Sequence, residues 1–180
     1  MTGKGRDSTR GIGRAMILTG WVVALVLLSL GFHRWFEQQH NPNQVVNSHF
    51  TADGSAEVVL LRNRHGHYVA NGKVNGYPAA FLLDTGASDI SVPGDLAQRW
   101  GLKRGLPRQY RTANGMITTF STQLERVELG DIVLDKVRAH INPHLGNHEI
   151  LLGMSFLKHL ELIQRGDTLT LRQHRRPASL

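Results

Sequence analysis

Hydrophobic and polar positions divide the chain into three stretches with different patterns. Residues 15–32, AMILTGWVVALVLLSLGF, carry no charged side chain, whereas residues 34–56 are polar and follow no regular period. From residue 57 onward, short apolar or β-branched runs recur between turn signals. The first pattern predicts a long apolar helix, the second a linker and the third a β-rich domain.

The apolar stretch is long enough to cross a membrane. Its 18 residues would span about 27 Å as a helix, close to the hydrocarbon thickness of a bilayer. Four Lys or Arg residues precede it and Arg34 alone follows closely, so the positive-inside rule keeps the N-terminus in the cytoplasm. We therefore expect a basic cytoplasmic segment at 1–14 and a transmembrane helix at 15–33.

A cleaved signal peptide is the alternative for the same stretch. Ser29 and Gly31 fit the small residues that precede a cleavage site. The apolar core of a signal peptide usually has about 7–15 residues. Because this run is longer, the pattern favours an uncleaved anchor.

The β-rich stretch carries four two-residue turn signals. Asn-Gly accepts the positive φ angles of a type I′ hairpin turn, and we read Gly-Asp as a hairpin turn as well. The predicted turns are Asn75-Gly76, Asn114-Gly115, Gly130-Asp131 and Gly166-Asp167. A helical turn is expected at 94–101 and a short helix after Gly153. Many short strands with so little helix predict an all-β barrel or sandwich.

Composition excludes several kinds of chemistry. The chain has 180 residues and no Cys, which rules out disulfides, thiol catalysis and Cys-type zinc sites. The net charge is +7; residues 1–44 carry five basic and two acidic residues, or +3, and most of the other basic residues are scattered. A nucleic-acid surface would need a basic stripe with interleaved aromatic side chains, and the sequence shows none.

Three histidines recur every four residues, at His140, His144 and His148. On a helix this spacing would line one face and suit a metal ion. Pro143 and Gly146 interrupt any helix there, so we expect a solvated loop. The sequence therefore predicts neither a metal site nor a cofactor.

A carboxylate at the end of a buried-looking strand is the most informative feature. Phe81-Leu82-Leu83 runs into Asp84, and Thr85-Gly86 follows. An ionised carboxylate there is costly unless it is hydrogen-bonded or functional, and a Thr-Gly loop can offer it backbone N–H groups. Two carboxylates about 3 Å apart share a proton and can activate water. One such motif per chain supplies half of that site, and a symmetric dimer would complete it.

Simpler readings of the same residues exist. Asp84-Thr85-Gly86 alone fits an ordinary turn capped by Asp. Asp-x-Gly-x-Ser is also the phosphate-loop pattern of sugar kinases and actin-like ATPases, but those folds need two large α/β domains, which this β-rich stretch cannot supply.

The motif resembles the active-site motif of retropepsin-like aspartic proteases. FLLDTGAS is joined by EILLGMSFL, residues 149–157, which resembles the apolar-apolar-Gly segment that packs behind the catalytic loop in that family. Between them, YRTANGMITTF is similar to the flap hairpin over the cleft. The segment HGHYVANGKVNGYPAAFLLDTGAS looks like the bacterial membrane-anchored branch. The resemblance covers residues 57–171.

The resemblance implies a role for each matching residue. Asp84 would be the catalytic carboxylate, Thr85 would hydrogen-bond to its twin across the dimer, and Gly86 would place its carbonyl near the substrate backbone. The residues expected on the substrate side are Ala87, Ser88, Asp89, Ala113, Asn114 and Gly115. Those expected to pack behind the loop are Ile150, Leu151, Leu152 and Gly153. Viral members often carry acidic residues at both 88 and 89, and their flap has several glycines; this chain has only the second acid and one flap glycine.

We therefore expect an all-β, retropepsin-like closed barrel with one short helix at 57–173, a linker at 34–56 and a basic tail at 174–180. The resemblance implies an aspartic endopeptidase that acts on peptides or proteins as a homodimer. It also implies a single-pass protein of a bacterial inner membrane with a periplasmic catalytic domain. The alternative is a catalytically silent, membrane-anchored peptide-binding dimer of the same fold.

Overall fold

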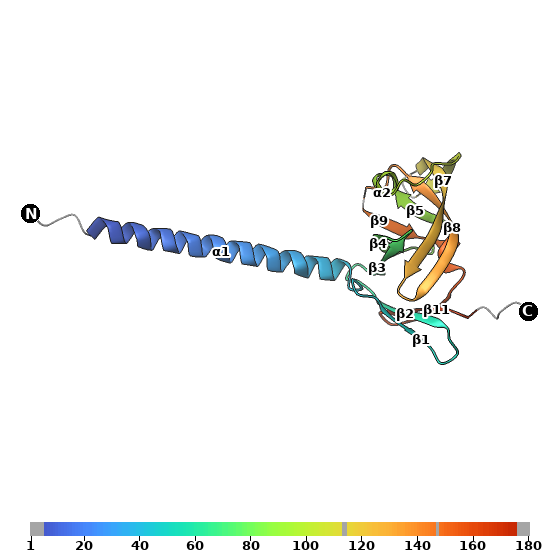
Figure 1. Ribbon diagram of the computed structural model, residues 1–180, viewed down its shortest axis with the longest axis horizontal. Helices are drawn as coiled ribbons and strands as arrows, with labels where there is room; N and C mark the ends of the chain where they lie inside the picture. Colours follow the sequence, from blue (N-terminus) through green and yellow to red (C-terminus); the bar gives the residue numbers. More distant parts are fainter. Residues whose placement is uncertain (1–5, 113–114, 147, 176–180) are drawn as a thin grey trace, which may run out of the picture. The chain divides into compact units, whose positions relative to one another are not determined.

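The computed structural model describes residues 6–112, 115–146 and 148–175 (Figure 1). The chain divides into two units, Met1–Gln39 and His40–Leu180. The described residues of the first unit are helical and the second unit is the β-rich domain, so each is described by itself.

Helix α1 runs from Arg6 to His40. Within the described residues it is the one helix that is long and apolar enough to cross a membrane, over Met16–His40, and a signal sequence near the N-terminus fits the same description. The helix continues past the predicted end at residue 33, through residues that contain neither Gly nor Pro. It ends at His40 because Pro42 disfavours helical geometry at the residue before it.

The rest of the expected linker belongs to the β-rich domain. Strand β1 (Asn47–Phe50) pairs antiparallel with β2 (Ala56–Leu61). Ahead of it, the buried Asn43 side chain donates from Nδ2 to the carbonyls of Leu61 and Val69 at 2.9 and 2.7 Å. Its Oδ1 accepts from the Leu61 N–H at 2.7 Å. These bonds order a segment that has no hydrophobic period.

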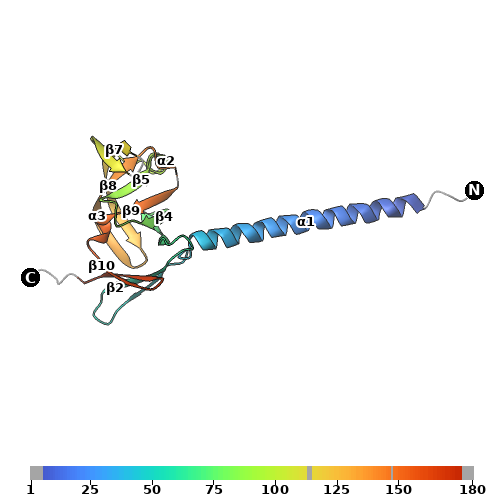
Figure 2. The ribbon, with the colours of Figure 1, turned by 180° about the vertical axis from the view of Figure 1, so that it is seen from behind.

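The β-rich domain contains two sheets. The smaller is antiparallel, in the order β1-β2-β11-β10, and the larger has the order β3-β4-β9-β5-β8-β7-β6. The smaller sheet lies at one end of the larger one (Figures 1 and 2). The remaining strands are β3 (Val69–Val74), β4 (Tyr77–Leu83), β5 (Ile90–Pro93), β6 (Pro107–Thr112), β7 (Gly115–Leu129), β8 (Ile132–Asn142), β9 (Glu149–Leu152), β10 (Glu161–Arg165) and β11 (Thr168–Gln173).

The all-β architecture and three of the four predicted hairpin turns are confirmed. Asn75 and Gly76 have φ angles of 51° and 83° and join β3 to β4, as a type I′ turn requires. Gly130 joins β7 to β8 and Gly166 joins β10 to β11, both with positive φ. The predicted turn at Asn114-Gly115 falls between β6 and β7 in the sequence, and Asn114 lies outside the described residues.

The predicted closed barrel is wrong in its detail, because the barrel is not strictly closed. The larger sheet curls until β3 meets β7, but only Lys73↔Glu128 and Val74↔Val127 are paired there. The close approach depends on Gly72, where a Cβ atom would lie 2.3 Å from the carbonyl oxygen of Glu128. Strands β1, β2, β10 and β11 form their own sheet outside this ring.

The described residues of the domain form two short helices, where one was predicted. The expected helical turn is a helix, α2 (Gly94–Arg99), and α3 (Met154–Leu157) follows Gly153. Helix α3 lies against β8 and β9 (Figure 2). Its Phe156 is fully buried together with Phe81 of β4 and Ile150 of β9, so the core reaches directly under the loop that follows β4.

Candidate functional site

The loop that carries Asp84 begins where β4 and β9 lie side by side. The two strands are parallel, with Leu83 opposite Leu152, and the Asp84 N–H donates to the Leu152 carbonyl at 3.2 Å. Asp84 is half-buried, and its Oδ1 accepts from the Gly86 N–H at 2.9 Å. The strand pairing fixes the Asp84 backbone, and the turn that follows holds its carboxylate.

The start of α3 holds the other end of this loop. The N–H groups of Met154 and Ser155 donate to the carbonyls of Ala87 and Ser88 at 2.8 and 2.9 Å. The Ser155 hydroxyl accepts from the Ile90 N–H at 3.0 Å. The N–H groups that a helix leaves without partners at its start are thus used to fix the loop.

Gly153 makes this close contact possible. A Cβ atom at this position would lie 2.4 Å from the carbonyl oxygen of Asp89 and 2.6 Å from that of Ala87. Both obstacles are backbone atoms, which cannot swing away as the end of a side chain can. Ile150 and Leu152 are buried beside Gly153, while Leu151 is half-buried and pairs with Ser91 of β5. The structure therefore brings the two sequence motifs together.

The outer side of the loop is open. Thr85, Gly86 and Ser88 are exposed, and Ala87 is half-buried. Among the described residues, no hydrogen-bond partner contacts the Thr85 hydroxyl. A cavity of about 250 Å³ opens beside residues 85–88, with Arg138, Met154, Ser155 and Lys158 on its other walls.

Asp89 points into the protein. It is only 5% exposed, its Oδ2 accepts from the Tyr110 hydroxyl at 2.8 Å, and its Oδ1 accepts from Arg138 Nε at 2.7 Å. Burial, followed by the hydrogen bond to Asp89, raises the pKa of Tyr110 above its ordinary value. In this chain, then, the acidic residue expected on the substrate side is bound by two side chains of the protein itself.

The hairpin of β6 and β7 occupies the place of the predicted flap in the chain. Thr112 pairs with Gly115, whose φ is 111°. Ala113 and Asn114 lie outside the described residues. In the part of the chain that the structure describes, β6 pairs with β7 alone and is the last strand of its sheet.

Two residues on β8 complete the surroundings of Asp89: Arg138, which no sequence pattern indicated, and His140, which was expected in a solvated loop but is buried in the strand. Arg138 and His140 both lie on β8, two positions apart and so on the same face. The His140 ring stacks on Tyr110, with centroids 4.5 Å apart and planes at 24°. The only signal in the sequence for this pair is that two polar residues alternate with the apolar residues Val137, Ala139 and Ile141.

Burial lowers the pKa of His140 below its ordinary value, although the nearby Asp89 charge acts in the opposite direction. His144 and His148 lie beyond the end of β8, and His148 Nδ1 is 3.0 Å from Asp95 Oδ2. In the described part of the chain, no three His, Asp or Glu side chains gather as a metal site would require.

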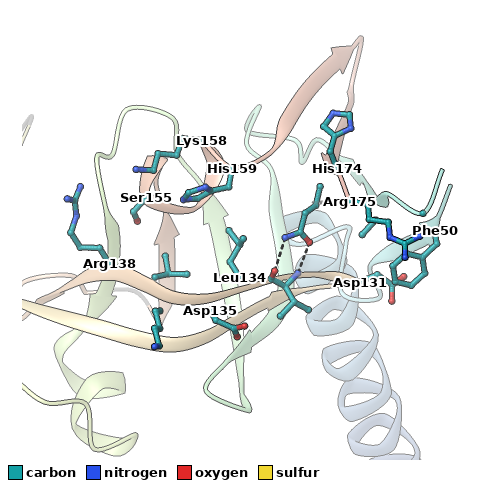
Figure 3. A pocket seen from close by; sticks show the side chains of 16 residues that line it. Phe50, Asp131, Leu134, Asp135, Arg138, Ser155, Lys158, His159, His174 and Arg175 are labelled. Carbon is teal, nitrogen blue, oxygen red and sulfur yellow. Dashed lines mark hydrogen bonds between the residues drawn. The ribbon is translucent and has the colours of Figure 1, made fainter. Parts of the chain in front are cut away.

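A second, larger cavity lies between β8, α3 and the end of β11 (Figure 3). It measures about 700 Å³ and shares Arg138, Ser155 and Lys158 with the cavity beside the loop. One wall is fixed by Gln173, whose side-chain amide pairs with the backbone N–H and carbonyl of Val133 at 3.2 and 2.8 Å. No sequence pattern predicted this cavity.

Comparison with known proteins gives one consistent result. Residues 70–159, half of the chain, match the family model "gag-polyprotein putative aspartyl protease". An uncharacterised protein of Rickettsia prowazekii (strain Madrid E) is 32% identical over 78% of this chain, and an uncharacterised protein from the cobV 5′ region of Sinorhizobium sp. is 34% identical over 67%. The chain spans 63% and 54% of the length of these two relatives.

A solved structure agrees with the family model. The crystal structure of a retropepsin-like aspartic protease from Rickettsia conorii superposes with a TM-score of 0.57 and 31% identity. The match covers 71% of this chain and 94% of that one.

Proposed function

The chain belongs to the retropepsin-like aspartic proteases, and we propose that it hydrolyses peptide bonds as a homodimer in which each protomer supplies one Asp84. The observation that carries this proposal is the Asp84 loop itself. A single carboxylate is held by the Gly86 N–H, at a loop fixed by β9 and α3, and its neighbours Thr85 and Gly86 are exposed. This arrangement is half of a two-carboxylate site.

The chemistry follows from bringing two such loops together about a twofold axis. Two carboxylates about 3 Å apart cannot both ionise, so they hold one proton between them. The ionised Asp84 takes a proton from a water molecule, which attacks the scissile carbonyl. The protonated Asp84 of the other protomer hydrogen-bonds that carbonyl and gives its proton to the oxygen, which leaves a tetrahedral diol. When the diol collapses, the C–N bond breaks, the leaving amine takes the proton that the first Asp84 accepted from water, and a diol hydroxyl returns a proton to the second Asp84. Because water is the nucleophile, no covalent intermediate with the protein forms. The two pKa values belong to the pair.

The neighbouring residues have supporting roles in this proposal. The exposed Thr85 hydroxyl hydrogen-bonds to the equivalent residue of the second protomer and holds the two loops together. The Gly86 carbonyl, Ala87 and Ser88 contact the peptide backbone, and the β6–β7 hairpin covers it. Asp89 supports the loop and does not contact the peptide, since Tyr110 and Arg138 already bind its two oxygens.

We assign α1 to the inner membrane as an uncleaved anchor, with the β-rich domain in the periplasm. The support is an uncharged stretch of 18 residues, preceded by four basic residues. A mature N-terminus near residue 32 in the purified native protein would instead identify a signal sequence.

The experiment compares the full chain with its Asp84→Asn variant, each reconstituted in lipid nanodiscs. A diverse peptide library is incubated with both from pH 3 to 8, and products are identified by mass spectrometry. We expect cleavage by the wild type and none by Asp84→Asn. Asp95→Asn is the matched control, because this exposed carboxylate pairs with Arg99 and His148 and should leave cleavage intact.

Two outcomes would contradict the proposal. Cleavage that survives Asp84→Asn would remove Asp84 from the chemistry. No cleavage by a wild type shown by ultracentrifugation to be dimeric would favour a silent peptide-binding dimer instead.

A further inference from the structure

The outer strand of the flap hairpin has a backbone partner on one side only. Strand β6 pairs with β7 along its whole length, and no other strand among the described residues pairs with it. Between residues 105 and 110, the other hydrogen bonds within the described chain also run to β7, except one. That exception is the Tyr110 hydroxyl, which donates to Asp89 Oδ2 at 2.8 Å.

This bond joins the flap hairpin to the catalytic loop. Asp89 is the fifth residue after Asp84, in the segment that α3 and Gly153 hold in place. The residue is only 5% exposed and its side chain 7%. A buried carboxylate requires partners for both oxygens, and here Tyr110 and Arg138 are those partners. Hydrogen bonds to an ionised acceptor are the stronger kind.

Two further contacts fix the geometry of this bond. The Tyr110 ring stacks on His140, which is 7% exposed. This stacking fixes the orientation of the ring and so the direction in which its hydroxyl points at Asp89. Arg138 reaches the other oxygen with a side chain that is 68% exposed, so it neutralises Asp89 from the solvent side. The raised pKa of Tyr110 keeps its phenol protonated, and therefore a donor, over the whole range in which carboxylates titrate.

We propose that Tyr110 is a positioning residue whose hydroxyl, bound to Asp89, latches the flap hairpin to the catalytic loop and so holds the peptide against Asp84. The proposal rests on the proposed function. It gives Asp89 the task of holding the flap, in place of contacting the substrate. When the latch is broken, the hairpin keeps its β6–β7 ladder but opens more often.

The first test measures backbone hydrogen exchange of the full chain in nanodiscs without substrate. Tyr110→Phe removes one oxygen and keeps the ring on His140. Tyr77→Phe is the matched control, because Tyr77 lies at the start of β4, at the opposite end of the strand from Asp84, and its ring stacks on Trp100. Loss of a hydrogen bond to a charged group corresponds to about tenfold or more in an opening equilibrium. We expect exchange in β6 and the start of β7 to rise about tenfold in Tyr110→Phe, with the β10–β11 hairpin unchanged.

The second test separates positioning from folding. With a peptide that the wild type cleaves, we expect Tyr110→Phe to raise KM about five- to tenfold and to leave kcat within about threefold. A residue with a merely structural role would lower the active fraction, and so lower kcat at constant KM. Unchanged exchange and unchanged KM, or a fall in kcat alone, would overturn the proposal.

The third test examines the pair. Asp89→Asn keeps an oxygen that accepts from Tyr110 but loses the charge that faces Arg138, so hairpin exchange should rise less than in Tyr110→Phe. Asp89→Ala should raise hairpin exchange as much as Tyr110→Phe does. In the double variant, Asp89→Ala with Tyr110→Phe, exchange should rise no further, because both substitutions remove the same bond. Additive increases in the double variant would show that the two residues act independently, contrary to the latch. If the wild type cleaves no peptide, the proposed function fails, while the exchange experiments still decide whether the latch exists.

Discussion

At the scale of single residues, His140 occupies an unusual position for an ionisable side chain. It lies beside Ser91 in the β5–β8 pairing and under the Tyr110 ring. Among the described residues, neither its Nδ1 nor the Ser91 hydroxyl has a hydrogen-bond partner. Asp89 is the charged group nearby, and its attraction is outweighed by burial, so the pKa of His140 is lowered.

This lowered pKa predicts a loss of stability in acid. The unfolded chain takes up a proton at His140 near pH 6.5, before the folded protein does. The stabilisation is therefore complete above about pH 6.5 and declines as the pH falls toward the lowered folded-state value. We expect the free energy of unfolding of the full chain, measured by denaturant titration, to fall with pH in this window. The slope should be smaller in His140→Gln and unchanged in His144→Gln, where the histidine is exposed. Equal slopes in wild type and His140→Gln would contradict the assignment.

Residues of the site differ in how far the sequence could predict them. Asp84, Thr85 and Gly86 stand together in one motif, so their local geometry follows from neighbouring positions, as the Gly86 N–H bond to Asp84 shows. The contacts of Asp89 come from Tyr110 and Arg138, which are 21 and 49 residues away. A carboxylate beside a motif gives no indication of which distant side chains will bury it.

At the scale of elements, the hairpin turns could be predicted from the sequence, whereas the closure of the large sheet and the structure of residues 41–46 could not. Asn75-Gly76 demands positive φ angles whatever surrounds it, so the β3–β4 hairpin could be predicted from two residues. The incomplete closure between β3 and β7 depends on how closely Gly72 allows two strands to approach. Likewise, residues 41–46 are held in place by side-chain to backbone hydrogen bonds. Such bonds produce no repeating pattern of hydrophobic residues in the sequence.

Asn43 provides a test of this view. Its side chain makes three hydrogen bonds to the backbone of Leu61 and Val69, and alanine would leave those backbone groups without that partner. We expect Asn43→Ala to lower the free energy of unfolding by about 2–3 kcal/mol. Asn47→Ala is the control, because Asn47 is exposed in β1 and should change stability by less than about 0.5 kcal/mol. Denaturant titration of the two variants measures the difference, and equal effects would show that the Asn43 bonds contribute nothing specific.

At the scale of the whole molecule, the limits of the β-rich unit determine how dimerisation can be measured. The unit begins at His40, not at the predicted residue 57, because Asn43 and β1 are bound to it. Residues 40–180 are therefore the part of the chain to compare with the full-length protein. An N-terminal anchor confines protomers to a plane and raises their effective concentration, which favours dimers without any new contact.

If each protomer supplies one Asp84, the cleavage rate must be proportional to the concentration of the dimer. For residues 40–180, cleavage per protomer should rise in proportion to concentration below the dissociation constant of the dimer and level off above it. If α1 is the proposed anchor, the full chain in vesicles should reach the same plateau at a bulk concentration at least about tenfold lower, because anchoring raises the local concentration of protomers. Cleavage rates and sedimentation velocity measured on the same dilution series test both statements.

Adding the Asp84→Asn fragment in excess should then inhibit the wild type, because mixed dimers contain one competent carboxylate. Cleavage per protomer that stays constant from the dimeric to the monomeric range would show that one chain suffices, which a single Asp84 per half-site does not allow.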